Sequence, residues 1–309
     1  MKSTLRRTWA EIDLDAIRHN YEVLRRRIGE DVKFLGIVKA DAYGHGAVHV
    51  ARTLQELGAD YLGVSSLDEA MELRANGIVM PILILGHTPA DQVPNLITNN
   101  ITQAVTCLAK AHEYNEAAAR FGARVRVHIK VDTGMSRLGV LCAGRHFDTG
   151  VNGIVDSCNM PNLEVEGIFT HFAVADETDA DDVDFTKRQL ELFKAAVSAV
   201  EQRLGRRIAI RHCANTGAVA LYPETYMDMV RPGLLLYGVF PAKETGGLDL
   251  RPAMSLYSRV SDVTHHHKGD TISYGRTFTC PRDMRLAVLP VGYADGLLRS
   301  LSGKGDVLL

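Results

Sequence analysis

Lys39 is the residue whose type and position most clearly suggest chemistry. It ends the apolar run at residues 35–38 and is followed by residues 40–46, which contain two glycines. A lysine amine can form a Schiff base with a carbonyl compound such as pyridoxal phosphate, and a parallel barrel places reactive groups at the carboxyl ends of its strands. A surface lysine before a glycine turn has the same local pattern, so Lys39 alone leaves both interpretations open.

Other polar residues raise the same choice between a functional site and an ordinary structural role. His171 would by itself be a core histidine, and Arg231 would be a surface arginine before the turn at residues 232–233. Three consecutive histidines at residues 265–267 suggest a metal, but neighbouring residues of a strand point to opposite faces. We interpret that run as a solvated strand end and expect no metal site.

Short apolar runs alternate with amphipathic stretches of helical length. Helices are predicted at residues 67–76 and 184–204, because a glycine directly follows each. The apolar runs predict strands within residues 34–38, 61–64, 82–85, 103–105, 125–129, 165–168 and 207–210.

This alternation predicts a parallel sheet, since parallel strands need crossover helices. Roughly eight such units over about 240 residues favour a closed (β/α)8 barrel of the TIM type. An open doubly wound sheet remains the alternative, although no GxGxxG motif follows the first strand.

The pattern changes at residues 241–247, a polar and turn-rich stretch that we interpret as a linker. Short β-like runs follow within residues 254–263, 271–274 and 286–291. The sequence thus predicts a cofactor-binding barrel over residues 1–240 and a mostly β domain over residues 248–309. The run at residues 306–309 resembles an unfinished strand, and about 60 residues rarely close a core of their own. We therefore expect that this β domain is truncated.

Composition excludes several other classes of protein. The 309 residues carry a net charge of -2, so no positive field invites nucleic acid. Five scattered cysteines without a CxxC pair favour free thiols in a reducing compartment. Acidic residues interrupt the N-terminal stretch, and no apolar run approaches the roughly 18 residues that a membrane span needs. The sequence therefore predicts a cytoplasmic protein with no membrane association.

The segment VKADAYGHG at residues 38–46 resembles the cofactor-lysine signature of the alanine racemases. Further segments resemble that family in the same order along the chain, namely WAEIDL at 9–14, KVDTGMSRLG at 130–139, VRPG at 230–233, SYGR at 273–276 and GYADG at 292–296. Members of the family bind pyridoxal 5'-phosphate and consist of a (β/α)8 barrel followed by a mostly β domain. The resemblance implies the same fold and cofactor here.

The resemblance also implies catalytic roles. Lys39 would hold the cofactor and act as the base on one face of the substrate Cα, while Tyr274 would act on the opposite face. Racemisation needs such a pair, because one group removes the proton and another returns it from the other side. A tyrosine needs help to act as a base near neutrality, and His171 and Arg231 would provide it. Arg231 would also face the pyridine nitrogen, where a cation disfavours protonation of the ring.

Binding roles follow from the same resemblance. Arg137 would bind the substrate carboxylate and would be oriented by Lys130, which is often carbamylated in relatives; a carbamate would form an ion pair with Arg137. Tyr293 would line the path by which the substrate enters. The cofactor phosphate would be bound by phenol, hydroxyl, amide and backbone N–H groups, contributed by Tyr43, Asn215, Thr216, Gly233 and Leu234.

Relatives are homodimers in which the residue matching Tyr274 comes from the partner, so the resemblance implies a homodimer with shared active sites. The implied reaction is the interconversion of L-alanine and D-alanine, which supplies a bacterial cell wall. A serine racemase or a broad-specificity racemase of the same fold remains an alternative. A barrel-type decarboxylase is disfavoured by Arg231, because such enzymes usually place an acid at the pyridine nitrogen. A non-catalytic pyridoxal-binding protein would be a single barrel and would lack the domain of Tyr274.

Overall fold

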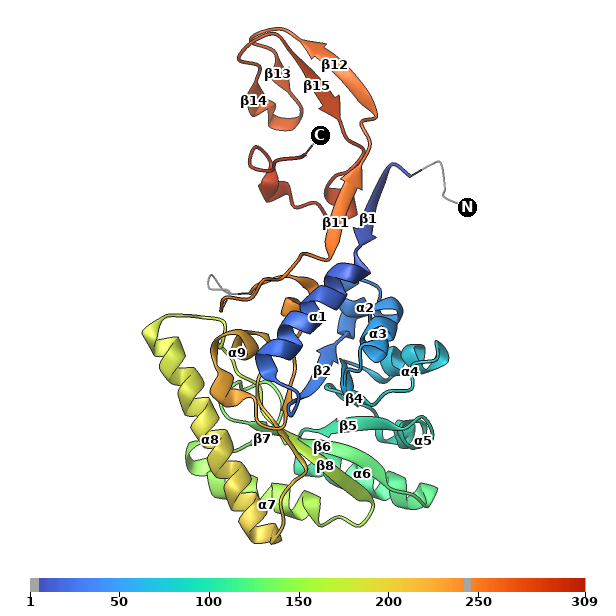
Figure 1. Ribbon diagram of the computed structural model, residues 1–309, viewed down its shortest axis with the longest axis vertical. Helices are drawn as coiled ribbons and strands as arrows, with labels where there is room; N and C mark the ends of the chain where they lie inside the picture. Colours follow the sequence, from blue (N-terminus) through green and yellow to red (C-terminus); the bar gives the residue numbers. More distant parts are fainter. Residues whose placement is uncertain (1–5, 242–245, 309) are drawn as a thin grey trace. The chain divides into compact units, whose positions relative to one another are not determined.

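The computed structural model describes residues 6–241 and 246–308 (Figure 1). Contacts divide the chain into a larger unit, Asp13–Ala253, and a smaller unit that joins the segment before Asp13 to the residues from Met254 onward. Most of the predicted linker, residues 242–245, lies outside the described residues. None of the described helices is long and apolar enough to cross a membrane.

The larger unit is built on eight parallel strands in the order β10-β2-β3-β4-β5-β6-β8-β9. Two backbone hydrogen bonds join the ends of this path, because the N–H groups of Asp228 and Arg231 donate to the carbonyls of Arg211 and Ala214 at 3.0 Å each. The predicted (β/α)8 barrel is thereby confirmed. The strands are β2 (Lys33–Ile37), β3 (Tyr61–Val64), β4 (Ile82–Ile84), β5 (Ile101–Val105), β6 (Val125–Asp132), β8 (Leu163–Phe169), β9 (Ile210–His212) and β10 (Met229–Val230), with β7 (Val140–Leu141) pairing beside β6.

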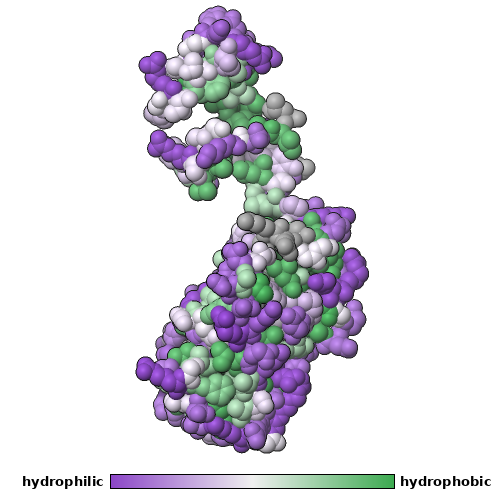
Figure 2. All heavy atoms as spheres, turned by 90° about the vertical axis from the view of Figure 1, so that its left-hand side faces the viewer, coloured by the Kyte–Doolittle hydropathy of each residue, from purple (hydrophilic) through white to green (hydrophobic). Residues whose placement is uncertain are grey.

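Helices surround this barrel (Figure 1), and hydrophilic residues are spread over the face of the larger unit that Figure 2 shows. The helices are α1 (Leu14–Ile28), α2 (Lys39–Gly44), α3 (Ala47–Glu56), α4 (Leu67–Ala75), α5 (Val93–Thr98), α6 (Leu108–Phe121), α7 (Phe147–Cys158), α8 (Ala180–Leu204) and α9 (Thr216–Leu221). Short 3-10 helices occur at Ala90–Gln92, Gly144–His146, Pro223–Thr225 and Leu234–Tyr237. Helix α8 begins four residues earlier than predicted, since extended Asp179 precedes a first turn whose acidic residues suit a helix N-terminus.

The smaller unit consists of short antiparallel pairs, which confirms its mostly β character. Strand β1 (Thr8–Ile12) pairs with β11 (Met254–Ser258), β12 (Asp262–His266) with β15 (Met284–Val288), and β13 (Thr271–Ile272) with β14 (Phe278–Thr279). Short 3-10 helices lie at Tyr274–Arg276, Tyr293–Asp295 and Arg299–Leu301. The expectation of a strand at residues 306–309 is wrong for its described part, because residues 306–308 pair with no described strand.

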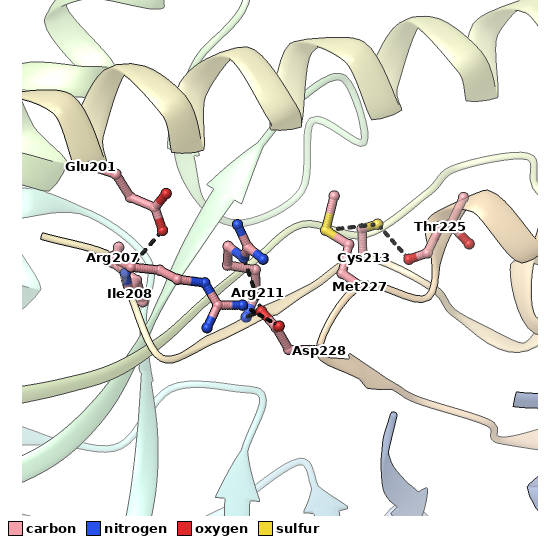
Figure 3. A network of polar contacts seen from close by, with 8 residues as sticks. All are labelled: Glu201, Arg207, Ile208, Arg211, Cys213, Thr225, Met227 and Asp228. Carbon is pink, nitrogen blue, oxygen red and sulfur yellow. Dashed lines mark hydrogen bonds and ion pairs between the residues drawn. The ribbon is translucent and has the colours of Figure 1, made fainter. Parts of the chain in front are cut away.

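Asp228 lies where the barrel closes, and Figure 3 shows it close to Arg207 and Arg211. Its carboxylate accepts hydrogen bonds from the backbone N–H and Nε of Arg211 at 2.8 and 2.9 Å, and from the Arg207 guanidinium. Its backbone carbonyl accepts the N–H of Lys33 at 3.0 Å, which connects the same residue to β2. Burial alone would raise the pKa of Asp228, but these hydrogen bonds outweigh it and hold the pKa below its ordinary value.

Replacing Asp228 with alanine is expected to lower the free energy of unfolding by about 2 kcal/mol, because charge-assisted hydrogen bonds at the closing seam are lost. Urea unfolding followed by circular dichroism measures the change. Asp249→Ala is the matched control, since the Asp249 side chain is 89% exposed and lies 3.7 Å from His19; such a surface pair contributes under about 1 kcal/mol. Equal decreases in the free energy of unfolding of the two variants would contradict a role of Asp228 in stabilising the closing seam.

Candidate active site

A cavity of about 390 Å³ is lined by residues at or just beyond the carboxyl ends of the barrel strands. This is the face on which barrels of this type carry their sites. Ten residues expected at the site line it together, namely Lys39, Tyr43, Lys130, Arg137, His171, Asn215, Thr216, Arg231, Gly233 and Leu234. The barrel thus brings into one pocket residues that are spread over almost 200 positions of the sequence.

Lys39 starts a turn of left-handed helix. Residues 40–43 have φ between 52° and 54°, although none of them is glycine. Such a backbone costs roughly 1–2 kcal/mol per residue, so specific contacts must hold it. Asp41 accepts the N–H of Ala47 at 2.7 Å, and Glu69 accepts the N–H of Ala40 at 2.8 Å. Strain of this kind is often found at functional sites, and here it directly follows the candidate lysine.

Glu69 connects this turn to the neighbouring strand. Its second oxygen accepts the N–H and Oγ of Ser65 at 2.7 and 2.9 Å, and Ser65 directly follows β3 and lines the cavity. Neither residue was expected at the site. The rule that singled out Lys39, a polar residue at the end of a predicted strand, applies equally to Ser65 and could have found it.

Arg231 is 3% exposed and directly follows β10. Its guanidinium donates to His212 Nδ1 at 3.0 Å, to His171 Nδ1 at 3.3 Å, and to the carbonyls of Thr170 and Cys213 at 2.8 and 3.1 Å. Among the described residues, no carboxylate oxygen lies within 4.0 Å of it. Burial lowers the pKa of Arg231 to about 10, so the guanidinium stays protonated at neutral pH.

His171 is held in one tautomer by Arg231. A guanidinium can only donate, so His171 Nδ1 accepts and the ring proton is on Nε2. The pKa of His171 lies well below its ordinary value because of burial, and then because of Arg231, Lys130 and the other cations of the cavity. A neutral imidazole therefore faces the pocket at neutral pH.

Two hydroxyl groups converge at Gly233. Thr216 Oγ1 accepts the N–H of Gly233 at 2.9 Å. A Cβ added at Gly233 would lie 2.9 Å from the Tyr43 hydroxyl and 3.1 Å from Thr216 Oγ1, so any larger residue there would have to displace these hydroxyls. Asn215 shapes the same turn by accepting the N–H of Ala218 at 3.1 Å. These groups form a small cradle of hydrogen-bond donors suited to an anionic oxygen cluster.

The cavity is rich in positive charge. Lys39, Lys130, Arg137 and Arg231 line it, against one acidic residue, Asp176. Lys130 and Arg231 also lie over the ring of Phe169, at 5.8 and 5.4 Å from its centroid, and such contacts stabilise a cation that has lost water. This balance favours a ligand that carries more than one negative charge.

Lys130 is 5% exposed, and burial followed by the charges of Arg137 and Arg231 lowers its pKa to about 8. Below pH 8 the lysine is protonated in folded and unfolded chains alike, so the cost of burying the charge is fully present. Between pH 8 and the ordinary lysine value of 10.5, the folded chain loses this proton first. The free energy of unfolding should therefore rise across that window, by at most about 3 kcal/mol.

Urea unfolding from pH 7.5 to 10 in carbonate-free buffer checks this expectation. In Lys130→Met this part of the rise should be absent, and the difference between the two proteins isolates Lys130 from other groups that titrate. If the two proteins differed in free energy of unfolding by the same amount at every pH, the lowered pKa of Lys130 would be contradicted.

Tyr274 and Tyr293 belong to the smaller unit, where their exposed fractions are 86% and 74%. They are not among the residues that line the cavity of the larger unit. The three histidines at residues 265–267 also lie in the smaller unit; His266 and His267 approach Asp270 and Asp283 at 3.7 and 3.4 Å. Among the described residues, no group of three or more metal-ligating side chains is suited to hold an ion.

Comparisons with known proteins agree along the whole chain. Residues 12–241 match the family described as "Alanine racemase, N-terminal domain" and residues 253–309 match "Alanine racemase, C-terminal domain". "Alanine racemase 2" of Caldanaerobacter subterraneus is 42% identical over 100% of this chain and 78% of its own length. The solved alanine racemase of Clostridium difficile 630 superposes with a TM-score of 0.87 at 39% identity, covering 96% of this chain and 76% of that one.

A histidine racemase from Leuconostoc mesenteroides also matches, with a TM-score of 0.80 and 30% identity over 95% of this chain and 77% of that one. The two family matches together cover nearly all residues, and the relatives are 30–42% identical. A shared fold alone does not produce such similarity. The chain therefore belongs to the alanine racemase family and is an isomerase.

Proposed function

We propose that this chain interconverts L-alanine and D-alanine and uses pyridoxal 5'-phosphate as its cofactor. The observation that carries the proposal is the shared cavity of Lys39 and Arg231, in which a primary amine and a buried guanidinium lie with the hydroxyl cradle at Gly233. Membership of the alanine racemase family supports the same reaction.

The residues of the cavity fit this cofactor. Its volume of about 390 Å³ lies within the range of small-molecule sites. The hydroxyls of Tyr43 and Thr216 and the amide side chain of Asn215 would hold the phosphate, and Lys39 would attach the carbonyl carbon. When bound, pyridoxal phosphate acts as an electron sink that makes the Cα hydrogen of an amino acid acidic.

The protein's own groups then bind, orient and move the proton. Arg137 would bind the substrate carboxylate, and Lys130 would orient it once carbamylated, because the carbamate is an anion that can pair with Arg137. The Lys39 amine would take the proton from, or return it to, one face of Cα. Arg231 stays protonated at neutral pH and can only donate, so the ring nitrogen it faces would receive no proton from a neighbouring acid.

A second proton carrier is required on the opposite face of Cα. We assign this role to Tyr274 of a partner subunit, so that a homodimer with shared sites is the active form, and we place Tyr293 along the path of the substrate. The smaller unit exposes several large apolar side chains that a partner subunit could cover; they include Leu256, Val263 and Leu298. The five cysteines of the whole chain are free thiols, which suits the reducing cytoplasm.

A broad-specificity racemase is the second candidate, because a solved histidine racemase also matches this chain at 30% identity. To separate the two, the purified protein with added pyridoxal phosphate is incubated with L-alanine, L-serine or L-histidine, and the enantiomers are separated by chiral chromatography. We expect kcat/KM for alanine to exceed the others at least about tenfold, as one pocket contact differing between substrates commonly gives. Fastest turnover of serine or histidine would favour the second candidate, and no turnover of any would refute both.

A further inference from the structure

A chain of hydrogen bonds leads away from Arg231 into the interior of the barrel. Arg231 Nη1 lies 3.0 Å from His212 Nδ1, and His212 Nε2 lies 2.9 Å from His128 Nδ1. His128 Nε2 lies 3.2 Å from Glu166 Oε2. None of His212, His128 and Glu166 lines the cavity, so the chain connects the site to a carboxylate outside it.

The direction of every bond in this chain follows from Arg231. Because a guanidinium only donates, His212 Nδ1 must accept and its proton is on Nε2. That proton is donated to His128 Nδ1, so the proton of His128 is on Nε2 and is donated to Glu166. One arrangement of neutral imidazoles thus satisfies all four ring nitrogens, with a cation at one end and an anion at the other.

The protonation states agree with this arrangement. His128 and His212 are 0% exposed, and burial lowers the pKa of both below the ordinary value. Burial would raise the pKa of Glu166, but the hydrogen bond from His128 and the nearby Tyr61 and Arg126 lower it. Glu166 is therefore ionised at neutral pH, and both histidines are neutral.

The backbone is shaped to permit this chain. In the pairing of β6 with β8, Val127 is opposite Val165 but His128 is opposite Gly167, so Glu166 is the extra residue of a β-bulge. Bulges re-aim side chains. A Cβ added at Gly167 would lie 2.5 Å from the ring of His128. A bulge and a glycine at the same point leave room for the imidazole beside Glu166.

We propose that Glu166 and His128 are positioning residues for Arg231. Glu166 is the remote counter-charge of the Arg231 guanidinium, which no carboxylate of the described residues touches. The two imidazoles between them fix the orientation of that guanidinium, because they allow only one direction of hydrogen bonding. The effect on catalysis rests on the proposed function, in which Arg231 faces the cofactor ring. The arrangement of protons in the chain of hydrogen bonds does not depend on the proposed function.

The test combines substitution with nitrogen NMR of the intact protein carrying ¹⁵N-labelled histidine, which reports the protonated nitrogen of each ring. In the unmodified protein, His128 and His212 should both carry their proton on Nε2. In Glu166→Ala, His128 loses its acceptor, and the ¹⁵N signals of both rings should change, although Glu166 does not touch His212. A merely local role would change His128 alone, and an unchanged His212 would overturn the proposal.

Glu164→Ala is the matched control, since Glu164 lies on the same strand and pairs with the same Arg126 at 3.5 Å but has no hydrogen bond to His128. It should leave both rings unchanged; a change equal to that of Glu166→Ala would overturn the proposal.

Glu166→Gln retains an oxygen that can accept from His128 but removes the charge. It should keep both tautomers, while kcat falls about tenfold at unchanged KM, the size of loss seen when a group that orients a functional residue from behind is altered. Normal kcat in this variant would overturn the counter-charge role. Because the NMR readout does not need turnover, a wild-type protein that makes no D-alanine would refute the proposed function and leave this test intact.

Discussion

Replacing Lys39 with alanine is expected to lower kcat for racemisation by at least about a thousandfold. The side chain has two tasks in the proposed function: it attaches the cofactor and moves a proton at Cα. Proton transfer by a positioned group alone contributes about 10²–10⁴-fold. The rest of the cavity, including the cradle at Gly233, stays in place, so cofactor binding should weaken without loss of the fold.

Chiral chromatography and the visible absorbance of the bound cofactor measure this change. Lys39→Arg keeps the positive charge but cannot attach the cofactor, so it should be as inactive as Lys39→Ala. Lys33→Ala is the matched control, because Lys33 lies on β2, the strand that precedes Lys39, is 45% exposed and pairs only with Asp60 at 3.7 Å among the described residues. If Lys39→Ala lost the absorbance yet racemised at the normal rate, the proposed function would be wrong.

Replacing Tyr274 with phenylalanine is expected to lower racemisation about 10²–10⁴-fold in both directions, because one of the two proton carriers is lost. The variant should still exchange the Cα hydrogen of alanine with solvent without inverting the configuration at Cα. In deuterium oxide, the alanine enantiomer whose Cα hydrogen faces Lys39 should still incorporate deuterium, and the other should not. Since the side chain is 86% exposed, loss of the hydroxyl should not change the free energy of unfolding.

Tyr257→Phe serves as the control, since Tyr257 is an exposed tyrosine of the same unit, stacked on Trp9. Mass spectrometry of the alanine follows deuterium, and chiral separation follows inversion. Normal racemisation by Tyr274→Phe would remove Tyr274 from the reaction.

Mixing the two inactive variants tests whether the site is shared. In a homodimer that takes Lys39 and Tyr274 from different subunits, a mixed dimer of Lys39→Ala and Tyr274→Phe has one intact site. Random exchange of subunits should therefore restore about a quarter of the normal activity, since half of the dimers are mixed. No recovery, despite mixed dimers in native mass spectrometry, would show that both residues act within one subunit.

Much of the barrel could be predicted from the sequence, because strands buried on both faces read as continuous apolar runs. Strand β10, Met229–Val230, has only two residues and could not be recognised in this way. Its place depends on backbone hydrogen bonds to β2 and β9, and on the carboxylate of Asp228 that secures Arg211. Those contacts join segments far apart in the chain, which periodicity does not reveal.

The candidate site shows the same division. A lysine at a strand end was visible from the sequence, but the left-handed backbone of residues 40–43 was not, because local preference assigns such angles to glycine. Only the tertiary contacts of Asp41 and Glu69 stabilise it.

By itself, then, the sequence determined which residue types stand at the ends of the strands, and hence the family, the fold class and the chemistry of Lys39. The tertiary structure alone decided which distant side chains meet. Arg231, His212, His128 and Glu166 come from four strands or strand ends, and their contacts depend on the closure of the barrel and on one bulge in β8. Register and closure arise from pairing between strands, so the pattern along any one strand does not specify them.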